Sequence, residues 1–169
     1  MEKNKRTVLT VLALFLAVSC AGPGTAVKRA RTTLSGLNDL PGDTEKLGAL
    51  ASIRSELGPY VEKGARNEEA YIVYINMLYE TALLEPGNRK DHYGNASLTA
   101  LLWKKVFPGS VIANYYIAKS LYLTESKEPE VIKKITGNAL FAAKNLPAEK
   151  FSAEIAELKD ILEDLDPVH

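Results

Sequence analysis

Apolar side chains recur every three or four residues through most of the chain from Asp43 onward. This spacing places them on one face of an α-helix, because a helix has about 3.6 residues per turn. Pairs such as Gly58-Pro59 and Pro108-Gly109 divide the pattern into segments of helix length. No two runs of alternating apolar and polar residues are joined by a hairpin signal. The sequence therefore predicts an all-α fold, and its short loops predict that neighbouring helices pack antiparallel.

The expected helices differ in how much of their surface is apolar. Segment 68–84 is apolar on nearly every side, which is typical of a buried central helix, and Asn67 is a good N-cap for it. The last segment has a regular apolar stripe from Phe151 to Leu165 and acidic residues elsewhere, which indicates a helix that covers the core or pairs with a partner helix. Residues 89–95 are polar and are expected to form a loop. The predicted helices cover residues 43–57, 68–84, 97–107, 111–122, 129–142 and 147–165.

The N-terminal segment has the pattern of an export signal. A short basic stretch precedes an apolar run from Val8 to Val18. This run is shorter than the roughly 20 residues that a membrane-spanning helix needs, and it is typical of a secretory signal peptide. The sequence Leu16-Ala17-Val18-Ser19-Cys20 then resembles a bacterial lipobox, although Leu is commoner where Ala17 stands. The alternatives are a signal cut at another position and an uncut membrane anchor.

The lipobox resemblance implies a lipid-anchored protein. It implies that residues 1–19 are removed and that Cys20 carries diacylglycerol and, on its amine, a further acyl chain such as palmitate. Ala21 follows the cysteine where an Asp would favour the inner membrane, so analogy with enteric bacteria favours the periplasmic face of the outer membrane. Residues 20–42, rich in small and turn-forming residues, are expected to form the lipidated N-terminus and a flexible tether, with a short helix over 26–34 as an alternative. Residues 43–169 are expected to form one helical domain.

Composition and motifs argue against several classes of function. The formal net charge is zero, so the chain lacks the basic excess of a nucleic-acid-binding protein. His92 and His169 are the two histidines, Cys20 is the one cysteine, and no zinc-ligand spacing occurs. A nucleophile elbow and phosphate-binding glycine patterns are also absent. We therefore expect no catalytic site, no metal and no cofactor.

Aromatic residues are the other candidate binding groups. Tyrosine and tryptophan offer both a ring to pack and a polar group to hydrogen-bond, which suits grooves and interfaces. An equally simple interpretation is that the rings line the core and that their hydroxyls reach its rim. If a groove between helices exists, its predicted lining is Tyr71, Tyr74, Trp103, Tyr115 and Tyr116.

One segment resembles a tetratricopeptide unit. Between Ser110 and Pro147, Ala118 and Leu121 match the first helix of such a unit, and Ala142 matches the second. The segment departs from the repeat pattern at Ile135 and Ala139, and its inter-helix loop is longer. The resemblance implies helix pairs stacked into a short α-solenoid, with an antiparallel helical bundle as the alternative.

These observations lead to a functional hypothesis. Tetratricopeptide-like lipoproteins include periplasmic adaptors and accessory components of solute transporters. The sequence therefore favours a non-catalytic helical adaptor, anchored to the membrane by lipid on Cys20, that binds a protein of the bacterial cell envelope. One alternative is a small-molecule carrier or sensor with an aromatic pocket between helices. The other is an enzyme of unknown type.

Overall fold

The computed structural model describes residues 22–125, 128–144 and 151–166, and these residues form an all-helical fold without strands. The signal segment, Cys20, Pro147 and His169 lie outside the described residues. The described helices are α2 (Pro23–Ser35), α3 (Asp43–Glu62), α4 (Glu68–Leu84), α5 (Arg89–Val106), α6 (Val111–Leu123), α7 (Pro129–Ala143) and α8 (Ser152–Leu165), with 3-10 turns η1 (Leu37–Asp39) and η2 (Pro86–Asn88).

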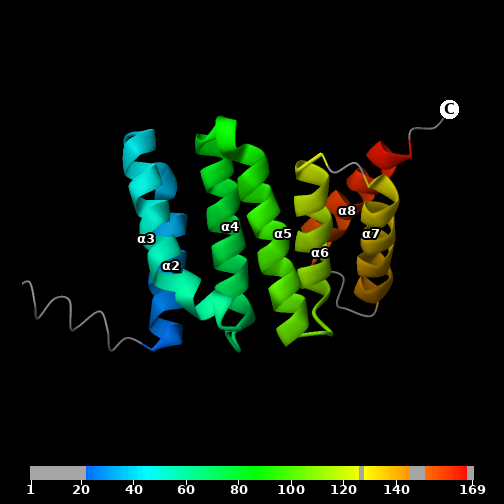
Figure 1. Ribbon diagram of the computed structural model, residues 1–169, viewed down its shortest axis with the longest axis horizontal. Coiled ribbons are helices and arrows are strands. Elements are labelled where there is room, and N and C mark those ends of the chain that lie inside the picture. Colours follow the sequence, from blue (N-terminus) through cyan, green and yellow to red (C-terminus); the bar gives the residue numbers. More distant parts are fainter. Residues whose placement is uncertain (1–21, 126–127, 145–150, 167–169) are drawn as a thin grey trace, which may run out of the picture.

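The helices stand side by side in a row and alternate in direction (Figure 1). Each packs most extensively against its neighbour in sequence, and α2 also contacts α4, α3 contacts α5 and α6 contacts α8. The predicted all-α architecture and its antiparallel helix pairs are confirmed. The bundle extends in one direction, with packing between successive helices as in an α-solenoid.

Helix α4 lies in the middle of the core, as its apolar sequence predicted. Tyr71, Ile75, Met77 and Leu78 are all fully buried. The Asn67 side chain accepts a hydrogen bond from the Glu69 backbone N–H at 3.0 Å, so the expected N-cap is present. The cap and these buried side chains hold the helix in place, and α3 and α5 pack on either side of it.

The expected flexible tether is wrong for the residues that the structure describes. From Pro23 to Ser35 the chain forms helix α2, and the turn η1 follows it directly. Ala26, Val27 and Ala30 of α2 are buried against the core, and Leu37 of η1 is buried with them. Small residues suggested flexibility, but the buried ones, Ala26 and Ala30, are good helix formers and also let α2 approach α3 and α4 closely.

Helix α3 continues past the point where the sequence predicted its end. Pro59 lies inside the helix, which runs on to Glu62. A proline at this position removes one backbone hydrogen bond. Leu57 and Val61 on either side of it are buried, so tertiary packing offsets that loss.

The expected polar loop over 89–95 is also wrong, because these residues form the first turns of α5. The exposed side chains from Arg89 to Asp91 suggested a loop, but other residues of the same segment face the core. His92, Tyr93, Ala96 and Trp103 follow helical spacing and are buried.

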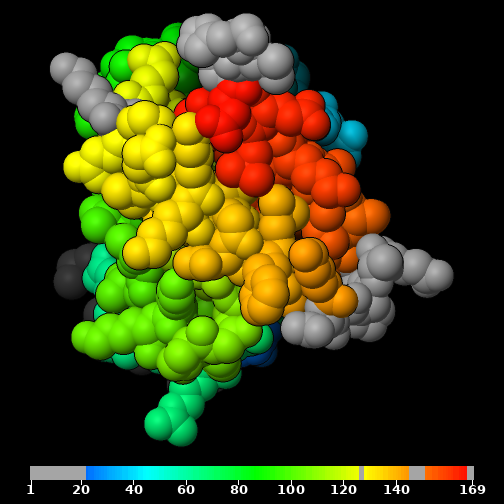
Figure 2. Space-filling model, turned by 90° about the vertical axis from the view of Figure 1, so that its right-hand side faces the viewer, coloured from blue at the N-terminus to red at the C-terminus, as the bar shows by residue number. Residues whose placement is uncertain are grey.

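The last two helices close the end of the row that faces the viewer in Figure 2. Leu158 of the predicted stripe in α8 is buried, and Ile161 is buried with it. The remaining residues of that stripe are partly exposed, so α8 covers the core with one narrow face. In α7 the buried residues are Ile132, Thr136, Ala139 and Ala143. Of these, Thr136 and Ala143 lie one residue beyond the apolar Ile135 and Ala142, which the helical spacing would place toward the core.

Candidate functional site

The aromatic residues predicted to line a groove instead fill the interior. Tyr71 and Trp103 are fully buried and stack with ring centroids 5.7 Å apart. Tyr115 and Tyr116 are buried and contact each other edge to face. Tyr74 alone of the five is partly exposed. Four of the five rings are therefore packed in the core, which is the alternative that the sequence left open for them.

Glu68 ties three helices together at one edge of this aromatic core. It is the first residue of α4, and its Oε2 accepts a hydrogen bond from Trp103 Nε1 at 2.8 Å. Ser110, the N-cap of α6, donates its hydroxyl to the same oxygen at 2.6 Å. The indole N–H is therefore satisfied despite complete burial of the ring, which avoids the cost of an unpaired buried donor.

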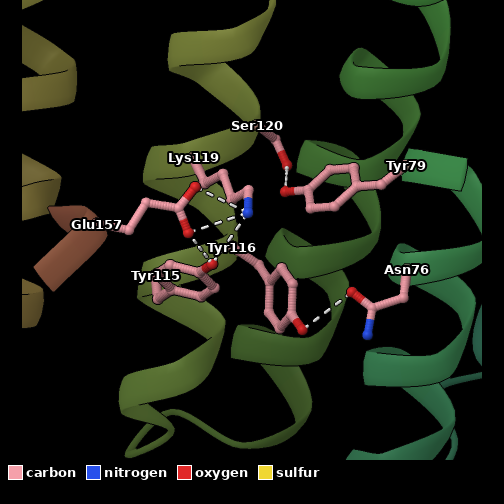
Figure 3. A network of polar contacts seen from close by, with 7 residues as sticks. All are labelled: Asn76, Tyr79, Tyr115, Tyr116, Lys119, Ser120 and Glu157. Atoms are coloured by element: carbon pink, nitrogen blue, oxygen red, sulfur yellow. Dashed lines mark hydrogen bonds and ion pairs between the residues drawn. The ribbon is translucent and has the colours of Figure 1, made fainter. Parts of the chain in front are cut away.

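A second polar network links α4, α6 and α8 (Figure 3). Lys119 forms an ion pair with Glu157 at 2.8 Å, and the hydroxyl of Tyr115 donates to the same carboxylate. We call Lys119, Glu157 and Tyr115 the α6–α8 cluster. Because Glu157 belongs to α8 and the other two belong to α6, the cluster holds α8 on the rest of the molecule.

The adjoining contacts connect the α6–α8 cluster to α4. Tyr79 and Ser120 share a hydrogen bond of 2.8 Å, and Tyr116 donates to Asn76 at 3.2 Å. The Lys119 ammonium lies 5.3 Å from the centroid of the Tyr79 ring and 5.6 Å from that of Tyr115. The rings and Glu157 together replace the water that the ammonium loses, since its side chain is only 22% exposed.

Burial raises the pKa values of the three tyrosines in this network. It raises the pKa of Tyr79, and it raises the pKa of Tyr116 to about 12. The pKa of Tyr115 is raised first by burial and then by its hydrogen bond to Glu157. The shifts make these three hydroxyls still harder to ionise than an ordinary tyrosine, and each makes a hydrogen bond that joins α6 to α4 or to α8.

Sequence reasoning missed the α6–α8 cluster, although one signal pointed to it. Lys119 is the only charged residue in helix α6, whose other members are mostly apolar. A lone cation in such a helix requires a partner when the helix is buried. The partner lies 38 residues away on another helix, where no local pattern indicates it.

His92 has a partner other than the adjacent Asp91. Its Nε2 lies 2.7 Å from Oε2 of Glu85, which joins the end of α4 to the start of α5. No group of three or more potential metal-ligating residues occurs among the described residues. None of the helices in that part of the chain is both long and apolar enough to cross a membrane.

Exposed apolar side chains form the most distinctive surface feature. Leu98, Leu101 and Leu102 of α5 are 61%, 49% and 40% exposed. Their spacing of three and four residues places them on one face of the helix, and we call this set the α5 ridge. A separate groove of about 570 Å³ lies between α7 and α8, with Leu140, Phe141 and Ile155 in its lining.

In comparisons with known proteins, no protein-family model, no curated protein and no solved structure matches this chain.

Proposed function

We propose that this protein is a lipid-anchored, non-catalytic adaptor of the bacterial cell envelope, held by Cys20 on the periplasmic face of the outer membrane. It binds an envelope protein, such as a transporter component or an assembly factor, through the α5 ridge. The proposal rests on one observation: three adjacent leucines project from α5 into solvent. Contiguous exposed apolar residues on a stable helical scaffold are typical of protein-interaction sites.

Two further features support an adaptor. The buried rings of α4, α5 and α6 occupy the space that an aromatic ligand pocket would need. The hydroxyls of Tyr79, Tyr115 and Tyr116 are hydrogen-bonded to side chains of neighbouring helices, so they serve as helix contacts. Anchoring by lipid adds a third element, because confinement to a surface raises the local concentration of the adaptor near envelope partners.

The test is crosslinking in living cells, followed by capture through a C-terminal tag and mass spectrometry. We expect the wild-type chain to recover one envelope protein in near-equal amount. The double substitution Leu98→Ser and Leu101→Ser is expected to abolish that recovery while changing stability little, since both side chains are exposed.

Leu83→Ser is the matched control, because Leu83 is 61% exposed but lies on α4 and outside the α5 ridge. It should leave recovery unchanged. Equal recovery by all three proteins would contradict the α5 ridge as the binding surface, and recovery of the chain alone would contradict the adaptor.

The lipid anchor has its own test. Metabolic labelling with palmitate is expected to mark the wild-type chain and not the Cys20→Ala variant. Equal labelling of the two proteins would refute lipidation at Cys20.

A small-molecule carrier is the second candidate, favoured by the groove between α7 and α8. Its volume of about 570 Å³ is within the range of ligand pockets, and Leu140, Phe141 and Ile155 give it apolar walls. Native mass spectrometry of protein purified from its host would show a bound small molecule lost on Phe141→Ser if this function is correct.

A further inference from the structure

The two ends of the helix row carry opposite charge. We define the basic end as the one where α2 begins, α3 and α5 finish and α4 and α6 start, at the bottom of Figure 1. Lys63, Arg66 and Lys105 are exposed there. They surround an open pocket of about 640 Å³ whose lining also includes Glu62, Val106 and Phe107.

The other carboxylates near the basic end are already engaged. Glu68 accepts hydrogen bonds from Trp103 and Ser110, and Glu69 is paired with Arg31. Arg31 neutralises Glu69, whereas Glu68 keeps its negative charge because its two donors are neutral. Glu62 and Glu68 therefore oppose the three cations, and the local charge stays positive.

The opposite end, which we call the acidic end, is dominated by carboxylates. Two of its cations are matched, since Lys90 pairs with Glu125 and Lys133 lies 2.5 Å from Asp166. The remaining exposed carboxylates there include Asp39, Asp43, Glu45, Glu163 and Asp164. The described helices are thus polarised along their length, with exposed cations at one end and exposed carboxylates at the other.

The start of the described chain lies at the basic end. Gly22 precedes Pro23, the first residue of α2, and α2 is docked on α3 and α4. Cys20 is two residues before Gly22, so the connecting chain spans at most about 7 Å. A lipid on Cys20 would therefore hold the basic end close to the bilayer, with no room for the molecule to turn over.

We propose that the protein stands on the membrane on its basic end, with Lys63, Arg66 and Lys105 against anionic phospholipid headgroups. This inference rests on the lipid anchor of the proposed function. The three cations complement headgroup phosphates, and the negative surface potential of an anionic leaflet attracts them. The carboxylates of the acidic end are repelled by the same surface and point away from it.

The experiment measures the distance of each end from the bilayer in the lipidated full-length protein. In that protein the sulfur of Cys20, the one native cysteine, is joined to diacylglycerol, so an introduced cysteine is labelled uniquely. Gly109→Cys places a fluorescent donor at the basic end, and Gly87→Cys places one at the acidic end. A Cβ added at either glycine meets no atom within 4 Å. The two sites are separated by the length of α5, about 27 Å at 1.5 Å per residue.

On vesicles that contain phosphatidylglycerol and a headgroup-labelled acceptor, we expect strong energy transfer from position 109 and weak transfer from position 87. The triple variant Lys63→Glu, Arg66→Glu and Lys105→Glu should markedly reduce the difference. The control variant Lys46→Glu, Arg89→Glu and Lys134→Glu makes the same change in charge away from the basic end and should preserve it.

Equal transfer from the two positions, or an unchanged difference in the triple variant, would overturn the inference. The anchor is scored separately, by palmitate labelling and by flotation of the protein with the vesicles. If the protein incorporates palmitate and floats with the vesicles but shows no preferred orientation, this inference alone is overturned. If it incorporates no palmitate, the proposed function is overturned as well.

Discussion

At the residue scale, Lys119 is held by contacts that compensate for its removal from water. Its ammonium pairs with Glu157 and lies beside the rings of Tyr79 and Tyr115. A partly buried pair is screened less by solvent than a surface pair, and removing one member leaves the other without full compensation. The α6–α8 cluster should therefore contribute measurably to stability.

We expect Lys119→Met to lower the free energy of unfolding by about 1–2 kcal/mol, because Glu157 loses its counter-ion while the side-chain length is kept. Lys90→Met is the matched control, since Lys90 and Glu125 form an exposed pair and should contribute little. Urea denaturation of the two variants measures the difference. Equal midpoints would show that the α6–α8 cluster does not stabilise the fold.

The raised tyrosine pKa values predict unfolding in alkali. The pKa of Tyr116 is about 12 in the folded protein, above its ordinary value of 10.0. Above pH 10 the unfolded chain loses the Tyr116 proton more readily than the folded chain. Stability is therefore intact below about pH 10 and declines as the pH rises towards 12.

The measurement is helical circular dichroism followed alongside tyrosinate absorbance between pH 9 and 12, where we expect a common transition. Tyr116→Phe should remove part of the pH dependence, although it also loses the hydrogen bond to Asn76. Ionisation of all tyrosines at their ordinary pKa in a protein that stays folded would contradict the link between tyrosine burial and alkaline unfolding.

The sequence predicted the residues whose role depends on near neighbours, and it missed those whose partners are distant. Asn67 was recognisable as an N-cap because the backbone N–H that it binds lies two residues away. Glu157 was assigned to a solvated face because nothing near it in the chain shows that Lys119 lies opposite. For the same reason the aromatic residues were identified, but the sequence left open whether they line a groove or fill the core.

At the element scale, α2 differs most from its expectation and has the largest consequence. A flexible tether would tolerate almost any polar substitution, whereas a docked helix would not. We expect Val27→Asp to destabilise the protein by about 2–4 kcal/mol, because Val27 is 3% exposed and a buried carboxylate would lack a partner.

Lys28→Asp introduces the same side chain at the adjacent exposed position and should change stability little. Thermal unfolding compares the two variants. Similar melting temperatures would indicate that α2 does not contribute to the folded core.

Two glycines, Gly48 within α3 and Gly64 in the turn after it, give predictions of opposite sign to each other. Gly48 is an exposed residue within α3, and a Cβ added there meets no atom within 4 Å. Gly48→Ala should stabilise the protein by about 0.5–1 kcal/mol, since alanine loses less backbone entropy on folding. Gly64→Ala should destabilise it, because Gly64 has φ +76° and an added Cβ approaches Val106 at 3.3 Å. Chemical denaturation that gave both variants the same sign would contradict the distinct backbone roles of the two glycines.

Element boundaries were less predictable than element types. Helices α4, α6 and α7 begin where capping residues or Pro129 predicted. The C-terminal end of α3 was misplaced because Pro59 resembles a helix breaker. The start of α5 was misplaced because the charged residues 89–91 resemble a loop. Only the burial of Val61 and His92, which depends on neighbouring helices, shows that the helix continues through each segment.

At the scale of the whole molecule, stability should vary along the helix row. The central helices α4 and α5 have packed neighbours on both sides, whereas α8 contacts mainly α6 and α7. Local opening costs least where fewest contacts are lost. Hydrogen exchange measured by mass spectrometry should therefore be faster for the amides of α8 than for those of α4. Uniform protection along the chain would indicate that the molecule opens as a single unit.

The open row of helices also determines which changes in chain length the fold can tolerate during evolution. Helices α2 and α8 lie at opposite ends of the row, and packing is strongest between successive helices (Figure 1). An insertion of one helical hairpin at an end therefore disturbs a single packed face and leaves the aromatic centre intact. Relatives that differ in length by whole hairpins would be structurally tolerable, and length variation should concentrate at the α8 end, away from the residues that adjoin Cys20.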